Sequence, residues 1–308
     1  MEKSGLRVRH PKALPPGSDD LSLDGPAIAS DKRLCERPAR HYITGSAGRS
    51  LWGETNMATA AQTTTSARSE ERFFFTLACT MAAIIVAGFS VNLAAGRSTF
   101  AVPPIYHIHA AVFFSWVGLF VTQTWLVASG NVALHRRLGW SSAILVPVMV
   151  GLGMAIMLVS LRRNGGPFFF DANEFLISNP IGLLTFAGLV MAAVRMRRRT
   201  GWHRRLMIGA MASLMGPGFG RLLPTPLLVP WAWEIASTAG MVFILAGMLR
   251  DKRHLGRVHP AWFVGLAAGI GWVVLGELLA YQPWAIELTK SVLAGHPGAA
   301  RPMQAYLP

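Results

Sequence analysis

Seven long blocks of apolar residues, separated by short polar segments, fill residues 73–282 of the chain. Each block has close to the ~20 residues that an α-helix needs to cross about 30 Å of hydrocarbon. The pattern therefore predicts an all-α fold, a polytopic transmembrane helix bundle of about seven helices. Because the connecting segments are short, neighbouring helices are expected to pack as antiparallel hairpins. The predicted crossings are 73–95, 103–129, 138–161, 174–195, 205–223, 230–249 and 261–281.

The fifth block is the weakest of the seven, because it contains Gly216-Pro217-Gly218. Proline lacks a backbone N–H and clashes with the preceding turn, so it breaks or kinks a helix. Two interpretations follow from this sequence. Either the fifth crossing is interrupted at Pro217, or the chain crosses six times and this block is a re-entrant segment.

A short motif occurs twice along the chain. LHRRLG at 134–139 returns 68 residues later as WHRRLM at 202–207, and each copy precedes an apolar block. The second and third predicted helices would then match the fourth and fifth in the same orientation, which is a parallel internal repeat. Since the two copies share only HRRL, the sequence leaves duplication and chance recurrence equally open.

The segments on either side of the bundle are polar. Residues 1–72 are rich in Pro, Gly, Ser and Asp without an apolar period, which predicts a disordered N-terminal tail. Met57 begins a stretch typical of an ordinary short leader, so we expect that residues 1–56 come from a misassigned translation start. Residues 283–308 are expected to form a short C-terminal tail.

Composition agrees with a membrane protein, because only 14% of the residues are charged whereas soluble domains average about 25%. The net charge of +14 raises the question of nucleic-acid binding, but the basic residues concentrate in short loops. The loops after the second, fourth and sixth predicted helices hold 12 basic residues, and the other three loops hold 4. The positive-inside rule therefore predicts a cytoplasmic N-terminus and an outside, periplasmic C-terminus, and it argues against nucleic acid as a partner.

Tryptophans at predicted helix ends are interpreted as the aromatic belt of the membrane interface. The residues concerned are Trp125, Trp140, Trp202, Trp231, Trp233, Trp262 and Trp284.

The repeated His-Arg-Arg motif suggests two functions. Imidazoles on neighbouring helices could ligate one haem iron from both sides. However, both histidines lie at a helix mouth beside arginines, whereas b-type haem requires a dry slot between helices. The sequence therefore favours a role in orientation and in binding lipid phosphates for His135, Arg136, Arg137, His203, Arg204 and Arg205.

Further ionisable groups gather toward the predicted outer side. A charge at membrane depth is unfavourable, by at least about 2.5 kcal/mol at the centre, so such groups tend to be paired and functional. Residues i and i+2 point to opposite helix faces, and we expect His109 rather than His107 to face the interior. Our hypothesis is a pocket open to the outer side, with Arg221 paired to a glutamate; the alternative is that the groups extend to the headgroups. The pocket residues are His109, Arg221, Glu234 and Glu277.

The motifs HRRLG, WHRRLM, YHIHA at 106–110 and FGRLLP at 219–224 carry a family likeness. Over roughly residues 73–265 the chain resembles uncharacterised multi-pass inner-membrane proteins of proteobacteria. This resemblance implies a location in the bacterial inner membrane and names no activity. The chain is also loosely similar to transmembrane b-type cytochromes, whose paired histidines hold haem.

Three classes of function remain open at this point. The first is a membrane protein that binds or carries a small molecule or lipid, of hydrophobic or anionic character, in the outer pocket. The second is a redox protein with b-type haem or quinone, and the third is a scaffold or assembly factor. The sequence contains no phosphate loop, GxSxG, HExxH or catalytic carboxylate pair, so it favours a non-enzyme. We predict no cofactor and no metal, with haem b kept as the alternative.

Overall fold

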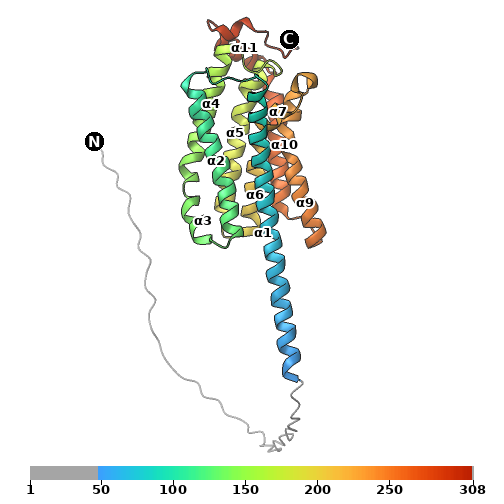
Figure 1. Ribbon diagram of the computed structural model, residues 1–308. Coiled ribbons are helices and arrows are strands. Elements are labelled where there is room, and N and C mark those ends of the chain that lie inside the picture. Colours follow the sequence, from blue (N-terminus) through green and yellow to red (C-terminus); the bar gives the residue numbers. More distant parts are fainter. Residues whose placement is uncertain (1–47, 307–308) are drawn as a thin grey trace, which may run out of the picture. The chain divides into compact units, whose positions relative to one another are not determined.

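The computed structural model describes residues 48–306, with side chains from Arg68 onward (Figure 1). Its contacts divide the chain into two units, residues 1–53 and 54–308, and all that follows concerns the second. Every regular element in the described part is helical, which confirms the predicted all-α bundle. Six of its helices are long and apolar enough to cross a membrane: Arg68–Ala94, Pro104–Ala128, Ser142–Asn164, Ala172–Arg195, Ala232–Leu255 and Pro260–Ala280.

These helices lie within a few residues of six predicted crossings. Arg68–Ala94 is the apolar part of α1 (Gly48–Ala94). The next three are α2 (Pro104–Ala128), α4 (Ser142–Asn164) and α5 (Ala172–Arg195), and the last is α10 (Pro260–Ala280). The predicted disordered tail lies outside the described residues as far as position 47, whereas residues 48–72 form the first part of α1.

The fifth predicted crossing is interrupted, as its sequence indicated. It consists of α6 (Thr200–Ser213) and α7 (Gly216–Leu222), and Pro217 stands in the first turn of α7, where a missing N–H removes no helical hydrogen bond. The two helices follow α1 along its length. Arg205 contacts Glu70 and the Arg221 guanidinium lies 4.0 Å above the Phe89 ring. Glu70 and Phe89 are 19 residues apart in α1, which corresponds to about 28 Å along the helix. α6 and α7 together therefore traverse the bundle.

The sixth crossing has a break that the sequence analysis did not predict. It consists of α8 (Ala232–Thr238) and α9 (Met241–Leu255), separated at Gly240. A Cβ atom at Gly240 would collide with the carbonyl oxygen of Ala212 and would lie 2.9 Å from Cβ of Met215. The interruption of the sixth crossing therefore lies directly against that of the fifth. Ala239 and Gly240 keep right-handed helical dihedrals, so the crossing continues from α8 into α9, and the close approach to Ala212 requires that Gly240 has no side chain.

The two copies of the repeated motif fold in related but unequal ways. LHRRLG forms a separate short helix, α3 (Val132–Gly139), before α4 begins, whereas WHRRLM lies within α6. In both copies the histidine Nδ1 lies at hydrogen-bond distance from a carbonyl of the preceding helix: His135 on Gln123 O at 3.3 Å and His203 on Ala193 O at 2.8 Å. This shared local arrangement supports the predicted repeat.

The C-terminal residues are not an extended tail. They form α11 (Pro283–Leu293) and the 3₁₀ helix η2 (Pro297–Ala300), which pack against α4 and α5. Arg301 anchors the following segment, because its Nη1 and Nη2 each donate a 2.5 Å hydrogen bond, to the carbonyls of Gly165 and Phe170. Figure 1 shows α11 at the same end of the bundle as α7. A second 3₁₀ helix, η1 (Thr225–Leu228), connects α7 to α8.

Candidate functional site

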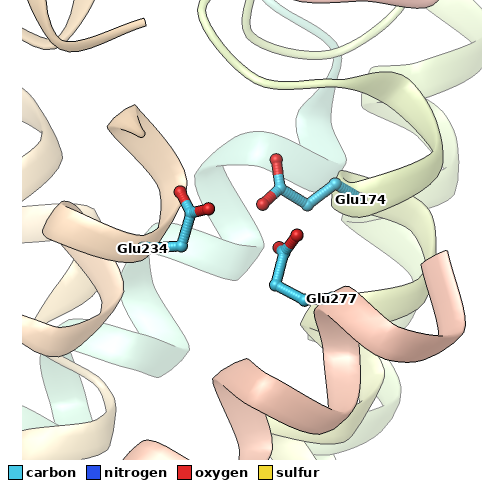
Figure 2. A group of neighbouring side chains, drawn as sticks. All are labelled: Glu174, Glu234 and Glu277. Carbon is cyan, nitrogen blue, oxygen red and sulfur yellow. The ribbon is translucent and has the colours of Figure 1, made fainter. Parts of the chain in front are cut away.

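Three glutamates from three helices meet at one end of the bundle, which we call the acidic end. Glu174 is in the first turn of α5, Glu234 is in the first turn of α8, and Glu277 is in the last turn of α10. One carboxylate oxygen from each residue lies within 4.8 Å of the others. Figure 2 shows the three side chains directed toward one another.

The environment of this glutamate triad is poor in compensating charge. Glu174 is only 4% exposed, and one oxygen each of Glu234 and Glu277 is fully buried and has no hydrogen-bond partner among the described residues. Among residues 68–306, no Lys or Arg side chain forms an ion pair with any of the three. Like charges this close repel strongly, all the more because Glu174 is buried and Glu234 and Glu277 are half-buried. The arrangement therefore requires a positive partner at the same point, either a cation or protons.

The local folds favour carboxylates at two of the three positions. Glu174 and Glu234 occupy first helical turns, where the N-terminal end of the helix dipole stabilises a negative charge. Glu277 lies at the C-terminal end of α10, where the helix dipole disfavours a negative charge. Its carboxylate therefore depends on neighbouring groups for stabilisation. Gly276 lets α10 approach α5 closely there, because a Cβ atom at this position would collide with Oγ of Ser178. That approach brings Glu277 to Glu174.

Aromatic side chains cluster around Trp233, the chain neighbour of Glu234. Trp233 meets the rings of Phe170, Phe175 and Trp272 edge to face, with ring centroids 5.0–6.3 Å apart. Trp233 and Trp272 are buried and their indole N–H groups have no partner among the described residues. Trp233 directly precedes Glu234 in α8, so an apolar aromatic cluster adjoins the triad, and low polarity strengthens electrostatic attraction.

The C-terminal segment covers the neighbouring loop. Asp171, the N-cap of α5, accepts hydrogen bonds from the Tyr281 hydroxyl at 2.9 Å and from the Ala305 backbone N–H at 2.6 Å. Burial, and next the negative charge of Glu174, raise the pKa of the Tyr281 phenol above its usual value of 10.0. Tyr281 therefore stays protonated and can donate to Asp171 throughout the neutral range.

Only half of the predicted outer pocket comes together. Glu234 and Glu277 meet, and Glu174, which no sequence pattern singled out, completes the site. Arg221 does not pair with a glutamate among the described residues: its guanidinium stacks on Phe89 and donates to the Pro217 carbonyl at 2.8 Å. The ring centroid of His109 lies 4.2 Å from that of Phe113, one turn further along α2, and its buried Nδ1 has no hydrogen-bond partner among the described residues.

The opposite end of the bundle, which we call the basic end, requires another correction. Arg205 was predicted to bind lipid phosphates, yet it is 1% exposed and makes a bidentate pair with Asp251, from Nε at 2.9 Å and from Nη2 at 2.7 Å. Glu70 accepts from Arg205 and Arg204. The Trp262 indole also donates to Asp251 at 2.9 Å. These residues form an internal ionic network that joins α1, α6, α9 and α10.

Two other arginines that were predicted to bind lipid phosphates are exposed, unlike Arg205. Arg136 and Arg137 are exposed in the last turn of α3, so their contact with lipid phosphates stays a prediction. The tryptophan belt also needs revision, because Trp233 and Trp262 are buried, whereas Trp125, Trp140, Trp231 and Trp284 are more than half exposed. A tryptophan at a helix end points to lipid or to the core according to the helix face, which position along the helix does not reveal.

Comparison of the chain with protein-family models, with curated proteins and with solved structures returned no match. The functional conclusion therefore rests on the geometry of the chain itself. The signal that could have found Glu174 is its place in the first turn of an apolar helix, at the same predicted membrane level as Glu234 and Glu277.

Proposed function

We propose that this membrane protein takes up a divalent cation at its acidic end through Glu174, Glu234 and Glu277. The observation that carries the proposal is the convergence of three carboxylate oxygens within 4.8 Å, from three helices, without a basic partner among the described residues. Three carboxylates repel an anion, so this geometry favours a cation over the anionic ligand considered from sequence. The proposal retains the predicted position of the pocket and changes the charge of its ligand.

The chemistry of the ligand atoms supports a hard cation. Carboxylate oxygens are preferred by Mg²⁺, Ca²⁺ and Mn²⁺. Oxygens bound to Ca²⁺ at 2.3–2.6 Å lie at most about 5 Å from one another, which matches the spacing of the triad. Three carboxylates leave coordination positions for water or for a counter-anion. Ca²⁺ and Mn²⁺ fit better than Mg²⁺, because Mg²⁺ demands near-ideal octahedral geometry and three side chains on separate helices supply it less readily.

The broken helices support a carrier rather than a static site. Discontinuous crossings whose half-helices end at the ligand are typical of membrane transporters. Here Glu234 lies in the first turn of α8, and the interruption between α8 and α9 at Gly240, six residues further on, adjoins the interruption between α6 and α7. We infer that cation binding between α8 and the continuous helices α5 and α10 shifts α8 relative to α9. The predicted periplasmic orientation of the acidic end would expose the site to external cations.

The test is Tb³⁺ luminescence on the full chain in detergent, since Tb³⁺ substitutes for Ca²⁺ and is sensitised by nearby tryptophan such as Trp233. We expect one saturable site from which Ca²⁺ and Mn²⁺ displace Tb³⁺. Glu174→Gln and Glu277→Gln should each weaken binding by at least about tenfold, because even groups behind a metal ligand contribute 10–100-fold. Glu287→Gln is the matched control, because Glu287 is exposed and pairs with Lys290.

Equal Tb³⁺ affinity in the wild type and both triad variants, each confirmed as folded by its thermal unfolding, would refute the proposal. If metal has no effect while Glu174→Gln raises the unfolding temperature, the triad holds protons instead. In liposomes, entry of Mn²⁺ can be followed by quenching of an enclosed dye. Influx that is lost in Glu234→Gln supports the carrier function, and binding without influx reduces the proposal to a cation-binding site.

A further inference from the structure

The basic end contains a second convergent pair of ligand-forming groups, His135 on α3 and His203 on α6. Their ring centroids are 6.2 Å apart and the ring planes are nearly perpendicular, at 82°. Each ring directs Nδ1 at a backbone carbonyl, Gln123 O for His135 and Ala193 O for His203. Among the described residues, neither Nε2 atom has a hydrogen-bond partner. The two copies of the HRRL motif thus each direct the imidazole Nδ1 at a carbonyl of the preceding helix and leave Nε2 without a hydrogen bond to a described residue.

This is the usual preparation of a metal-binding histidine. A ligating imidazole generally donates its other N–H to a carbonyl or carboxylate, which fixes the ring and leaves a lone pair on the ligating nitrogen. An imidazole bound at about 2.0–2.1 Å has its ring centre roughly 3 Å from the ion. Two such rings on opposite sides of one ion therefore have centres roughly 6 Å apart. The separation of 6.2 Å agrees with near-linear coordination and exceeds what a bent pair requires.

We propose that His135 and His203 bind one Cu⁺ ion through their Nε2 atoms. Imidazole is a ligand for copper, zinc, iron and nickel, and among these Cu⁺ is satisfied by two donors in a line. Zn²⁺ and Ni²⁺ would need further protein ligands, and no group of three or more His, Cys, Asp or Glu residues converges here among the described residues. The copper site is independent of the glutamate triad.

Charge around the pair also favours a monovalent ion. Arg136 adjoins His135, and Arg204 and Arg205 follow His203 in the chain. Arg205 is neutralised by Asp251 and Arg204 by Glu70, while Arg136 is exposed without an ion pair among the described residues. The two imidazoles are neutral ligands, so they do not offset a second positive charge. Repulsion from the residual basic charge is about half as large for Cu⁺ as for a divalent ion.

Packing near the pair favours an ion over a porphyrin. Phe120 and Val190 lie about one helical turn from the two carbonyl acceptors, toward the middle of the bundle, and they are 3% and 4% exposed. Both belong to the main hydrophobic core. Side chains therefore already fill the space into which the flat ring of a haem would have to extend.

Gln123 affects which nitrogen of His135 is free. In one orientation of the Gln123 side-chain amide, the oxygen accepts a hydrogen bond from the Gly139 N–H at 2.9 Å. The NH₂ group then donates to Nδ1 of His135 at 2.5 Å. That arrangement puts the proton of His135 on Nε2, whereas the hydrogen bond to the Gln123 carbonyl puts it on Nδ1. Metal binding requires the second tautomer. Gln123→Leu, which removes the competing donor, should therefore strengthen copper binding.

The experiment is a competition between the purified full chain and a chromogenic Cu⁺ chelator, under ascorbate. We expect one Cu⁺ per chain, at least about tenfold weaker binding in His135→Gln and in His203→Gln, and tighter binding in Gln123→Leu. His254→Gln is the matched control, because His254 is exposed on α9. Cys79→Ser tests the free thiol of the described residues, and Glu174→Gln tests the triad; both should retain the wild-type affinity.

Unchanged Cu⁺ affinity in both histidine variants would overturn the proposal. If the variants do not fold, X-ray absorption of copper bound to the wild type decides: two nitrogen ligands in a near-linear arrangement support the site, and sulfur ligation refutes it. A Soret band in the purified wild type that disappears in His203→Gln would also overturn it, because the pair would then hold haem.

Discussion

The buried ionic network at the basic end leads to a quantitative prediction, the effect of Asp251→Ala. The Asp251 carboxylate accepts two hydrogen bonds from Arg205, one from the Trp262 indole and one from the backbone N–H of His259. Arg205 and Asp251 are each 1% exposed. Removing the carboxylate leaves a buried guanidinium whose one remaining acidic contact within residues 68–306 is Glu70, at 3.3 Å.

The magnitude follows from the uncompensated charge. Breaking a buried ion pair by removing one partner lowers the free energy of unfolding by about 3–5 kcal/mol. This corresponds to a roughly 10²–10⁴-fold change in the ratio of folded to unfolded protein. Replacing both partners by apolar residues of similar size is often neutral or stabilising. We therefore expect Arg205→Met combined with Asp251→Leu to recover most of the stability that Asp251→Ala loses.

The assay is unfolding in mixed micelles of mild detergent and SDS, followed by circular dichroism and by tryptophan fluorescence. Lys252→Ala is the control, because Lys252 is exposed beside Asp251 on α9, and it should change the unfolding free energy by less than about 0.5 kcal/mol. A loss below about 1 kcal/mol in Asp251→Ala, or no recovery in the double variant, would show that the pair does not hold α6 against α9 and α10.

Three shorter predictions test other contacts. Gly88→Ala should lower the unfolding temperature, because a Cβ atom there collides with the backbone of α7, whereas Gly151→Ala, which meets nothing within 4 Å, should be neutral or stabilising by about 0.5–1 kcal/mol. Because the pKa of Tyr281 is raised in the folded protein, the contribution of Tyr281 to stability is complete below pH 10.0 and is lost as the pH rises through its pKa in the folded state. Unfolding scans at alkaline pH should show this loss, and Tyr281→Phe should abolish it. Arg301→Ala should release the C-terminal segment from the loop that precedes α5, measured as faster proteolysis of that segment, and wild-type proteolysis rates would contradict the anchor.

Much of the fold was predictable because the bilayer acts on local sequence. A crossing helix must satisfy its own backbone hydrogen bonds and must be long enough for the hydrocarbon, so apolar length alone located six crossings to within a few residues. Gly216-Pro217-Gly218 also marked the fifth crossing as interrupted, since proline acts on the helix that contains it. The break at Gly240 escaped prediction because its cause is a contact with Ala212 on another helix.

The candidate sites were predictable only in part. Glu234 and Glu277 stood out as acidic residues at membrane depth, but nothing local distinguished Glu174 as their partner. Arg205 and Arg137 hold the same place in the two copies of the HRRL motif, yet Arg205 is buried against Asp251 while Arg137 is exposed. Their difference depends on which helix packs opposite each copy.

The sequence alone thus determined that this is a membrane protein made of helices, where those helices cross, and that ionisable groups concentrate near their ends. The tertiary structure decided which of those groups meet: the glutamate triad, the pair of Arg205 with Asp251, and the approach of His135 to His203. The physical reason is that lipid and helix interior are both apolar, so a membrane helix is hydrophobic all round and its pattern does not reveal its inward face. Rotation and packing of the helices supply that information.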